Sequence, residues 1–176
     1  MRLNEVRKLL DENGIEYRLT VEPNRREYYE KKGFRTAGNA GAFYLLTIPN
    51  PNHSKNLELN FADASENPKF CDLDFGGFWH ELFDCPDDLL RETLLEEISK
   101  VLAGKVWVVF ATNAKNGAWF FDGVYYNEAD TDRNDMDELR TTIEKIKRPK
   151  SLWRKLTGRR DCYEIFNWTD YEKIIK

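Results

Sequence analysis

The chain has 176 residues, with 27 Lys or Arg against 31 Asp or Glu, so its formal net charge is -4. Its length fits a single domain that can bury a core without help from disulfides or metals. The negative net charge excludes a uniform positive coat for binding nucleic acid or a membrane surface, although it leaves room for a local basic patch.

The N-terminal sequence and the cysteines favour the cytoplasm. Residues 1–10 carry a charge every few positions and lack the apolar stretch of about 7–15 residues found in signal peptides. The longest apolar run, Val106–Ala111, is far shorter than a membrane span of about 20 residues. Three widely spaced cysteines are typical of free thiols. We therefore expect a cytoplasmic protein that does not enter a membrane.

The first half of the chain predicts one helix followed by strands. Apolar residues recur at helical spacing over Leu3–Leu10, and Asn13-Gly14 supplies a stop. Residues Ile15–Val21 then alternate between apolar and polar, which is the pattern of a half-buried strand. Three further antiparallel strands are predicted at 43–48, 57–61 and 71–75.

A long helix opens the second half. The range Pro86–Ala103 has an apolar stripe at helical spacing, with Pro in the first turn and Gly104 after the last. Val106–Ala111 follows as a strand buried on both faces. Ala118–Phe121 is predicted to pair with it, and Asp122-Gly123 to turn into another short strand.

The C-terminal region predicts two more helices around a strand. Met136–Ile146 is helical and must end before Pro149, and Ser151–Thr157 could add a turn or two. Cys162–Trp168 is predicted to be a buried strand, and Thr169-Asp170 to cap a last helix that reaches Lys176. The predicted class is α+β: one domain over residues 1–176, with a largely antiparallel mixed sheet and helices packed on one side.

Several partial motifs fall short of a metal site. His80–Asp84 lacks the second His of the zinc-protease motif. Cys71, His80 and Cys85 could meet at zinc only if the fold brings them together, because they contain no closely spaced ligand pair. Residues 130–141 begin with the acidic pattern of a calcium-binding EF-hand loop. However, Asp135 stands where that loop needs Gly, and Thr141 stands where it needs a bidentate Glu. We expect no metal, no cofactor and no catalytic residue.

Charge is strongly segregated along the chain. Between residues 72 and 97 there are nine acidic residues and one basic residue, whereas residues 145–160 hold eight basic residues and no acidic one. Such segments can be solvated faces that neutralise one another. They can also be opposed patches that steer association with charged partners.

Two stretches resemble a known group of binding proteins. They are Phe75–Asp84, which is aromatic and acidic, and Cys162–Tyr171. With the size and acidity of the chain, they resemble the small cytosolic immunity proteins of bacterial polymorphic-toxin systems. The resemblance implies a non-enzymatic protein that neutralises one cognate toxin, commonly a basic nuclease, by direct binding. Carboxylates standing in for phosphates would attract such a partner.

The expected partner-binding surface is acidic with one tryptophan. Alternation along the strand at 71–75 predicts that its two carboxylates point outwards, while the apolar neighbours face the core. The surface comprises Asp72, Asp74, Trp79, Glu81, Asp84, Asp87 and Asp88.

The basic segment suggests an alternative function. An aromatic residue within a cationic groove suits single-stranded nucleic acid. The residues of this alternative site are Lys147, Arg148, Lys150, Trp153, Arg154, Lys155, Arg159 and Arg160. An enzyme whose site is assembled from residues distant in sequence is a third possibility.

Overall fold

The computed structural model describes residues 3–22, 43–61, 71–76, 80–82, 87–128, 135–149 and 160–176. The chain divides into two compact units, Met1–Ser99 and Lys100–Lys176. Helices and antiparallel sheets are present together, so the predicted α+β class is confirmed. One domain over residues 1–176 stays a prediction.

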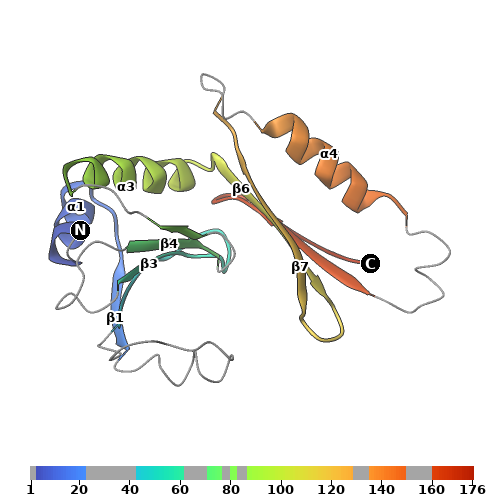
Figure 1. The fold of residues 1–176 in the computed structure, drawn as a ribbon, viewed down its shortest axis with the longest axis horizontal. Helices are drawn as coiled ribbons and strands as arrows, with labels where there is room; N and C mark the ends of the chain where they lie inside the picture. The colour runs from blue at the N-terminus through green and yellow to red at the C-terminus, as the bar shows by residue number, and fades with distance from the viewer. Residues whose placement is uncertain are drawn as a thin grey trace. The chain divides into compact units, whose positions relative to one another are not determined.

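The first unit is built on a five-stranded antiparallel sheet in the order β1-β2-β3-β4-β5 (Figure 1). The predicted run of three antiparallel strands is confirmed as β2, β3 and β4. Among the described residues, α1 and most of α3 belong to this unit. The bounds are α1 Leu3–Glu12, β1 Arg18–Glu22, β2 Phe43–Ile48, β3 Leu57–Phe61, β4 Cys71–Phe75, β5 His80–Leu82 and α3 Asp87–Leu102.

One face of this sheet is apolar because side chains alternate along each strand. Leu46, Leu59 and Leu73 are cross-strand neighbours on that face, and all three are fully buried. The two helices supply further buried side chains at helical spacing, on the stripes that the sequence predicted. In the first unit these are Val6, Leu9 and Leu10 of α1 and Leu94 and Ile98 of α3, while Val101, which is also buried, lies in the part of α3 that belongs to the second unit.

The predicted glycine stops of α1 and α3 are confirmed. Gly14 and Gly104 have φ values of 65° and 70°, a left-handed conformation that glycine adopts without a Cβ penalty. At the end of α3 the amide of Lys105 donates to the carbonyl of Lys100 over 2.9 Å. This bond satisfies a carbonyl that the last helical turn leaves without an intrahelical partner.

The strand predicted over Ile15–Val21 forms only from Arg18 onwards, and it is not half-buried on its apolar side. Leu19 and Val21 are 38% and 51% exposed. The reason is position, because β1 is an edge strand with a neighbour on one side only.

The second unit contains a four-stranded antiparallel sheet in the order β7-β6-β8-β9. Helix α4 packs on one face of it, where Leu139 and Ile146 join Val109, Tyr125 and Ile165 in one buried cluster. The bounds are β6 Val106–Asn113, β7 Trp119–Tyr126, α4 Met136–Lys147, β8 Asp161–Phe166 and β9 Tyr171–Ile175. The possible helix at Ser151–Thr157 lies outside the described residues.

The turn predicted at Asp122-Gly123 is wrong, since β7 continues through both residues. Gly123 is needed for space instead. A Cβ at this position would lie 2.8 Å from the hydroxyl oxygen of Tyr125, whose ring folds back over the glycine. The Tyr125 hydroxyl donates to Oγ1 of Thr142 on α4 over 3.2 Å. Glycine therefore allows the tyrosine to reach the helix.

The helix predicted after Thr169-Asp170 is also wrong, because Tyr171–Ile175 forms β9 and pairs with β8. The connecting turn is organised by Asn167, which is 4% exposed. Its Oδ1 accepts bonds from the amides of Thr169 and Asp170, at 2.8 and 2.6 Å. Its Nδ2 donates to the carbonyl of Gly104 over 3.3 Å. Asn167 therefore holds the amides of Thr169 and Asp170 in a turn between two strands, and these residues do not begin a helix.

Replacing Asn167 with Ala is expected to destabilise the protein by about 1–3 kcal/mol, because turn amides lose their acceptor. Chemical denaturation measures the loss. Asn127→Ala, which makes the same change at an exposed position of the second unit, is the control and should change stability by about 0.5 kcal/mol or less. Equal effects of the two variants would contradict this role of Asn167.

Leu94→Ala is expected to cost about 2–5 kcal/mol, because the side chain is fully buried and its loss leaves a cavity. The free energy of unfolding, measured in denaturant, tests this value. Glu92→Ala on the exposed face of the same helix is the matched control. A loss below about 1 kcal/mol for Leu94→Ala would mean that the site collapses around the smaller residue.

Candidate functional site

The structure separates the acidic residues predicted on β4 and β5. Asp74 pairs with Glu58 on β3 and with His80 on β5, so these positions share one face of the sheet. Glu81 pairs with Leu73 and therefore belongs to the opposite, apolar face. By register, Asp72 and Asp74 occupy positions of one face and Glu81 a position of the other, and a shared binding surface of these residues stays a prediction.

The expectation that Asp74 points into solvent is wrong. Its exposed fraction is only 9%, and Leu73 and Phe75 on either side are fully buried. Alternation along a strand distinguishes its two faces, but it does not show whether the second face is covered as well.

A row of polar residues crosses the whole five-stranded sheet at this position. The register aligns Arg18, Thr47, Glu58, Asp74 and His80 as successive cross-strand neighbours. Like charges directly opposite each other are destabilising unless they have other partners. Glu58 and Asp74 both take part in interactions within the structure. We therefore interpret these polar residues as part of the fold and not as a binding site.

The other predicted site residues lie in or next to segments that the structure does not describe. Trp79 and Asp84 lie outside the described residues, as does Cys85. Asp87 and Asp88 occupy the first turn of α3. His80–Leu82 is a strand rather than a turn, which removes the helical spacing that the zinc-protease motif requires.

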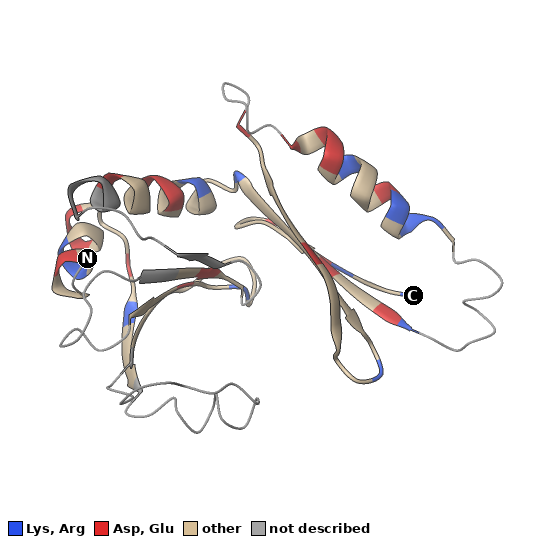
Figure 2. Ribbon diagram, in the orientation of Figure 1, with Lys and Arg blue, Asp and Glu red and all other residues tan. Residues whose placement is uncertain are grey.

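The outer face of α3 carries acidic residues that the sequence analysis did not single out. Glu92 and Glu96 are exposed and lie one helical turn apart, in the part of α3 whose acidic residues Figure 2 colours red. Their spacing of four residues was the available signal. We call Glu92 and Glu96 the α3 acidic stripe. It places carboxylates on one side of a rigid element.

The basic segment meets one end of the second sheet. Lys147 is the last residue of α4, and its Nζ lies 3.0 Å from Oε2 of Glu172. Arg148 follows as the C-cap residue. The carbonyl of Arg160 accepts a bond from the amide of Ala114 in the β6–β7 turn, over 2.8 Å. The remaining members of the alternative site, which are Lys150, Trp153, Arg154, Lys155 and Arg159, lie outside the described residues.

Three consecutive aromatic residues of β7 are exposed, and the sequence analysis assigned them only to a strand. Trp119, Phe120 and Phe121 are 59%, 39% and 38% exposed. They belong to an edge strand, next to the β6–β7 turn. Three adjacent aromatic residues in an edge strand are the feature of the sequence that could have pointed to this surface.

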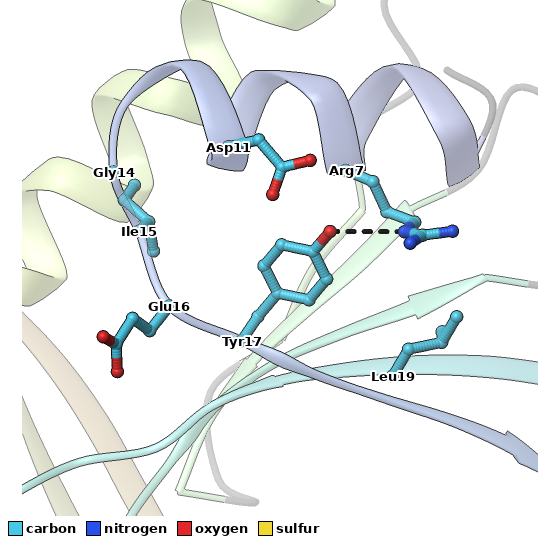
Figure 3. Close-up of a pocket in the computed structure, with 7 residues that line it drawn as sticks. All are labelled: Arg7, Asp11, Gly14, Ile15, Glu16, Tyr17 and Leu19. Atoms are coloured by element: carbon cyan, nitrogen blue, oxygen red, sulfur yellow. Dashed lines mark hydrogen bonds between the residues drawn. The ribbon is translucent and has the colours of Figure 1, made fainter.

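An open pocket lies between α1 and the start of β1 (Figure 3). Nε of Arg7 donates to the hydroxyl of Tyr17 over 3.2 Å, and this bond raises the pKa of Arg7 above its usual value. Asp11 and Glu16 complete its charged lining. The pocket has no His, Cys or Ser, so it offers neither an activated nucleophile nor a base that titrates near neutral pH.

The end of the calcium-like sequence is used by the fold. The carboxylate of Asp135 accepts a bond from the amide of Tyr126 over 3.0 Å. Thr141, at the position of the bidentate Glu, donates its hydroxyl to the carbonyl of Asp137 within α4. Among the described residues, no three His, Cys, Asp or Glu side chains are grouped so that they could hold a metal ion.

A scan against protein-family models, a search of curated proteins and a search of solved structures each returned no match. In the described part of the chain, no helix has the length and apolar composition needed to span a membrane.

Folding is expected to be independent of metal ions. Thermal melts with and without a strong chelator should give the same midpoint, because Thr141 and Asp135 are engaged in fold contacts rather than arranged as ligands. A lower midpoint with chelator, restored by adding back a single metal, would contradict this expectation.

Proposed function

We propose that the protein is a non-enzymatic binding protein of the immunity-protein type, which neutralises a basic protein partner by covering it. The α3 acidic stripe is the observation that carries this proposal. Glu92 and Glu96 are exposed on a helix whose opposite side is anchored by buried Leu94 and Ile98. The carboxylates are therefore presented without any need to rearrange the core.

Charge complementarity is the physical basis of the proposal. Acidic groups on a fixed helix raise the rate at which a cationic protein is captured, and salt screens this effect. In the sequence, Asp87 and Asp88 are two further acidic residues at the start of the same helix. A nuclease-type toxin is the favoured partner class, because its basic substrate-binding surface attracts carboxylates as it attracts phosphates.

The test uses the double variant Glu92→Lys with Glu96→Lys. The partner tested is a small basic nuclease-type domain, sought first in the product of the neighbouring upstream gene. Association rates are measured at about 0.01 M and about 0.15 M ionic strength. The double variant should associate at least about tenfold more slowly at low salt, and its rate should depend less on salt.

The matched control is Glu138→Lys with Glu144→Lys, which reverses two exposed carboxylates on α4. This control has the same net charge as the test variant, so a difference between them reports the location of the charge. Equal association rates for the two folded variants would overturn the proposed surface. Absence of binding by the unaltered protein would overturn the proposed function.

A further inference from the structure

The aromatic residues of β7 are gathered on one face by an irregularity in the strand. The register between β6 and β7 shifts at Ala111/Thr112, so Phe120 is an extra residue between two paired positions. Phe121 pairs with Ala111, and Ala111 pairs with Tyr163 on the other side. The Phe120 and Tyr163 rings meet edge to face, with centroids 6.2 Å apart. We call Phe120, Phe121 and Tyr163 the sheet aromatic cluster.

This cluster remains partly open although its face of the sheet carries α4. The helix packs over Val109, Tyr125 and Ile165, which are 5% exposed or less. Phe120 and Phe121, further along β7, keep 39% and 38% of their surfaces exposed. Single exposed apolar residues are common on proteins, but adjacent aromatic rings on one sheet end form a contiguous patch that indicates binding.

Positive charge surrounds the same end of the sheet. Lys115 lies in the β6–β7 turn, where its amide bonds to Oδ1 of Asn113 over 2.9 Å. Arg160 lies beside it through the bond between its carbonyl and Ala114. Lys176 is the cross-strand neighbour of Asp161, with two backbone bonds of 2.7 and 2.8 Å. The Asp161 side chain is fully buried and so is not presented to a ligand.

The end of α4 adds to this positive charge. The ammonium group of Lys176 donates to the carbonyl of Arg148, which ties the cation after α4 to the end of β9. Glu172, a nearby exposed carboxylate, is already paired with Lys147. The described surface at this end therefore combines aromatic rings with an excess of cations.

We propose that this end of the second unit binds single-stranded nucleic acid, with bases stacking on the sheet aromatic cluster and phosphates contacting Lys115 and Arg160. Every base has a π-face, so stacking tolerates many sequences, while the cations follow the backbone. A duplex keeps its bases stacked inside and cannot use the rings in this way. The site is distinct from the α3 acidic stripe, and the inference does not depend on the proposed protein partner.

The probe is a fluorescein-labelled oligothymidylate of about 16 nucleotides, the upper end of common single-strand site sizes. Fluorescence anisotropy measures its affinity for the full chain at several salt concentrations. Phe121→Ala should weaken binding about tenfold without changing the salt slope, because it removes one stacking surface. Lys115→Glu with Arg160→Glu should weaken binding and reduce the salt slope by about 1.4, which corresponds to two lost phosphate contacts on a single strand.

Matched controls separate position from chemistry. Tyr171→Ala removes an aromatic residue of similar exposure, 40%, from the opposite edge strand. Lys8→Glu with Lys105→Glu makes the same charge change at exposed positions that are not part of the proposed site. Both controls should bind the probe within about twofold of the unaltered protein, a difference below half a kcal/mol.

Three results would overturn the inference. The first is no binding of the probe, and the second is equal affinity for a duplex of the same length, which would show charge attraction without stacking. The third comes from sedimentation. If Phe121→Ala converts a dimer into a monomer and leaves the probe affinity unchanged, the cluster is an interface between copies of this chain. Circular dichroism of each variant verifies that it is folded.

Discussion

The alternation of side chains along each strand imposes the constraint on which the rest of this structure depends. An antiparallel sheet has two faces, and its apolar face must be covered by another layer. In the first unit the buried leucines of β2, β3 and β4 line up across the sheet, and in the second unit α4 seals Val109 and Ile165. Which polar groups are left for binding follows from how completely each face is covered.

Helix α3 combines a buried apolar stripe with exposed carboxylates. Leu94 and Ile98 are fully buried, whereas Glu92 and Glu96 lie on the exposed side of the same turns. Because the helix is anchored through its apolar stripe, the carboxylates are held at a fixed spacing. By contrast, the sheet buries Asp74 among cross-strand neighbours. A carboxylate in a central strand is poorly suited to capturing a partner from solution, and one on the outer side of a helix is well suited to it.

The second unit places its exposed groups where helical cover stops. Tyr125 reaches α4 over Gly123 and is buried, but Phe121, four residues earlier in β7, is not. The β-bulge at Phe120 adds a ring to the face that carries α4, at the end that the helix leaves exposed, and the β6–β7 turn brings Lys115 beside Arg160. Bulges at sheet edges commonly redirect side chains for a function. Opposite charges on the two units would allow each to engage a different class of partner.

The sequence by itself determined the elements whose patterns are local. The stripe Leu94–Ile98, the glycines at 14 and 104 and the alternation in β2, β3 and β4 correctly predicted helices, stops and strands, because each depends on neighbours within a few residues. Only the tertiary structure decided that Asp122-Gly123 lies within a strand and that Tyr171–Ile175 is β9, because pairing with distant strands outweighs local turn and cap preferences. It also decided that Asp74 is buried and Phe121 exposed, since exposure depends on the layer that covers each face and not on residue type.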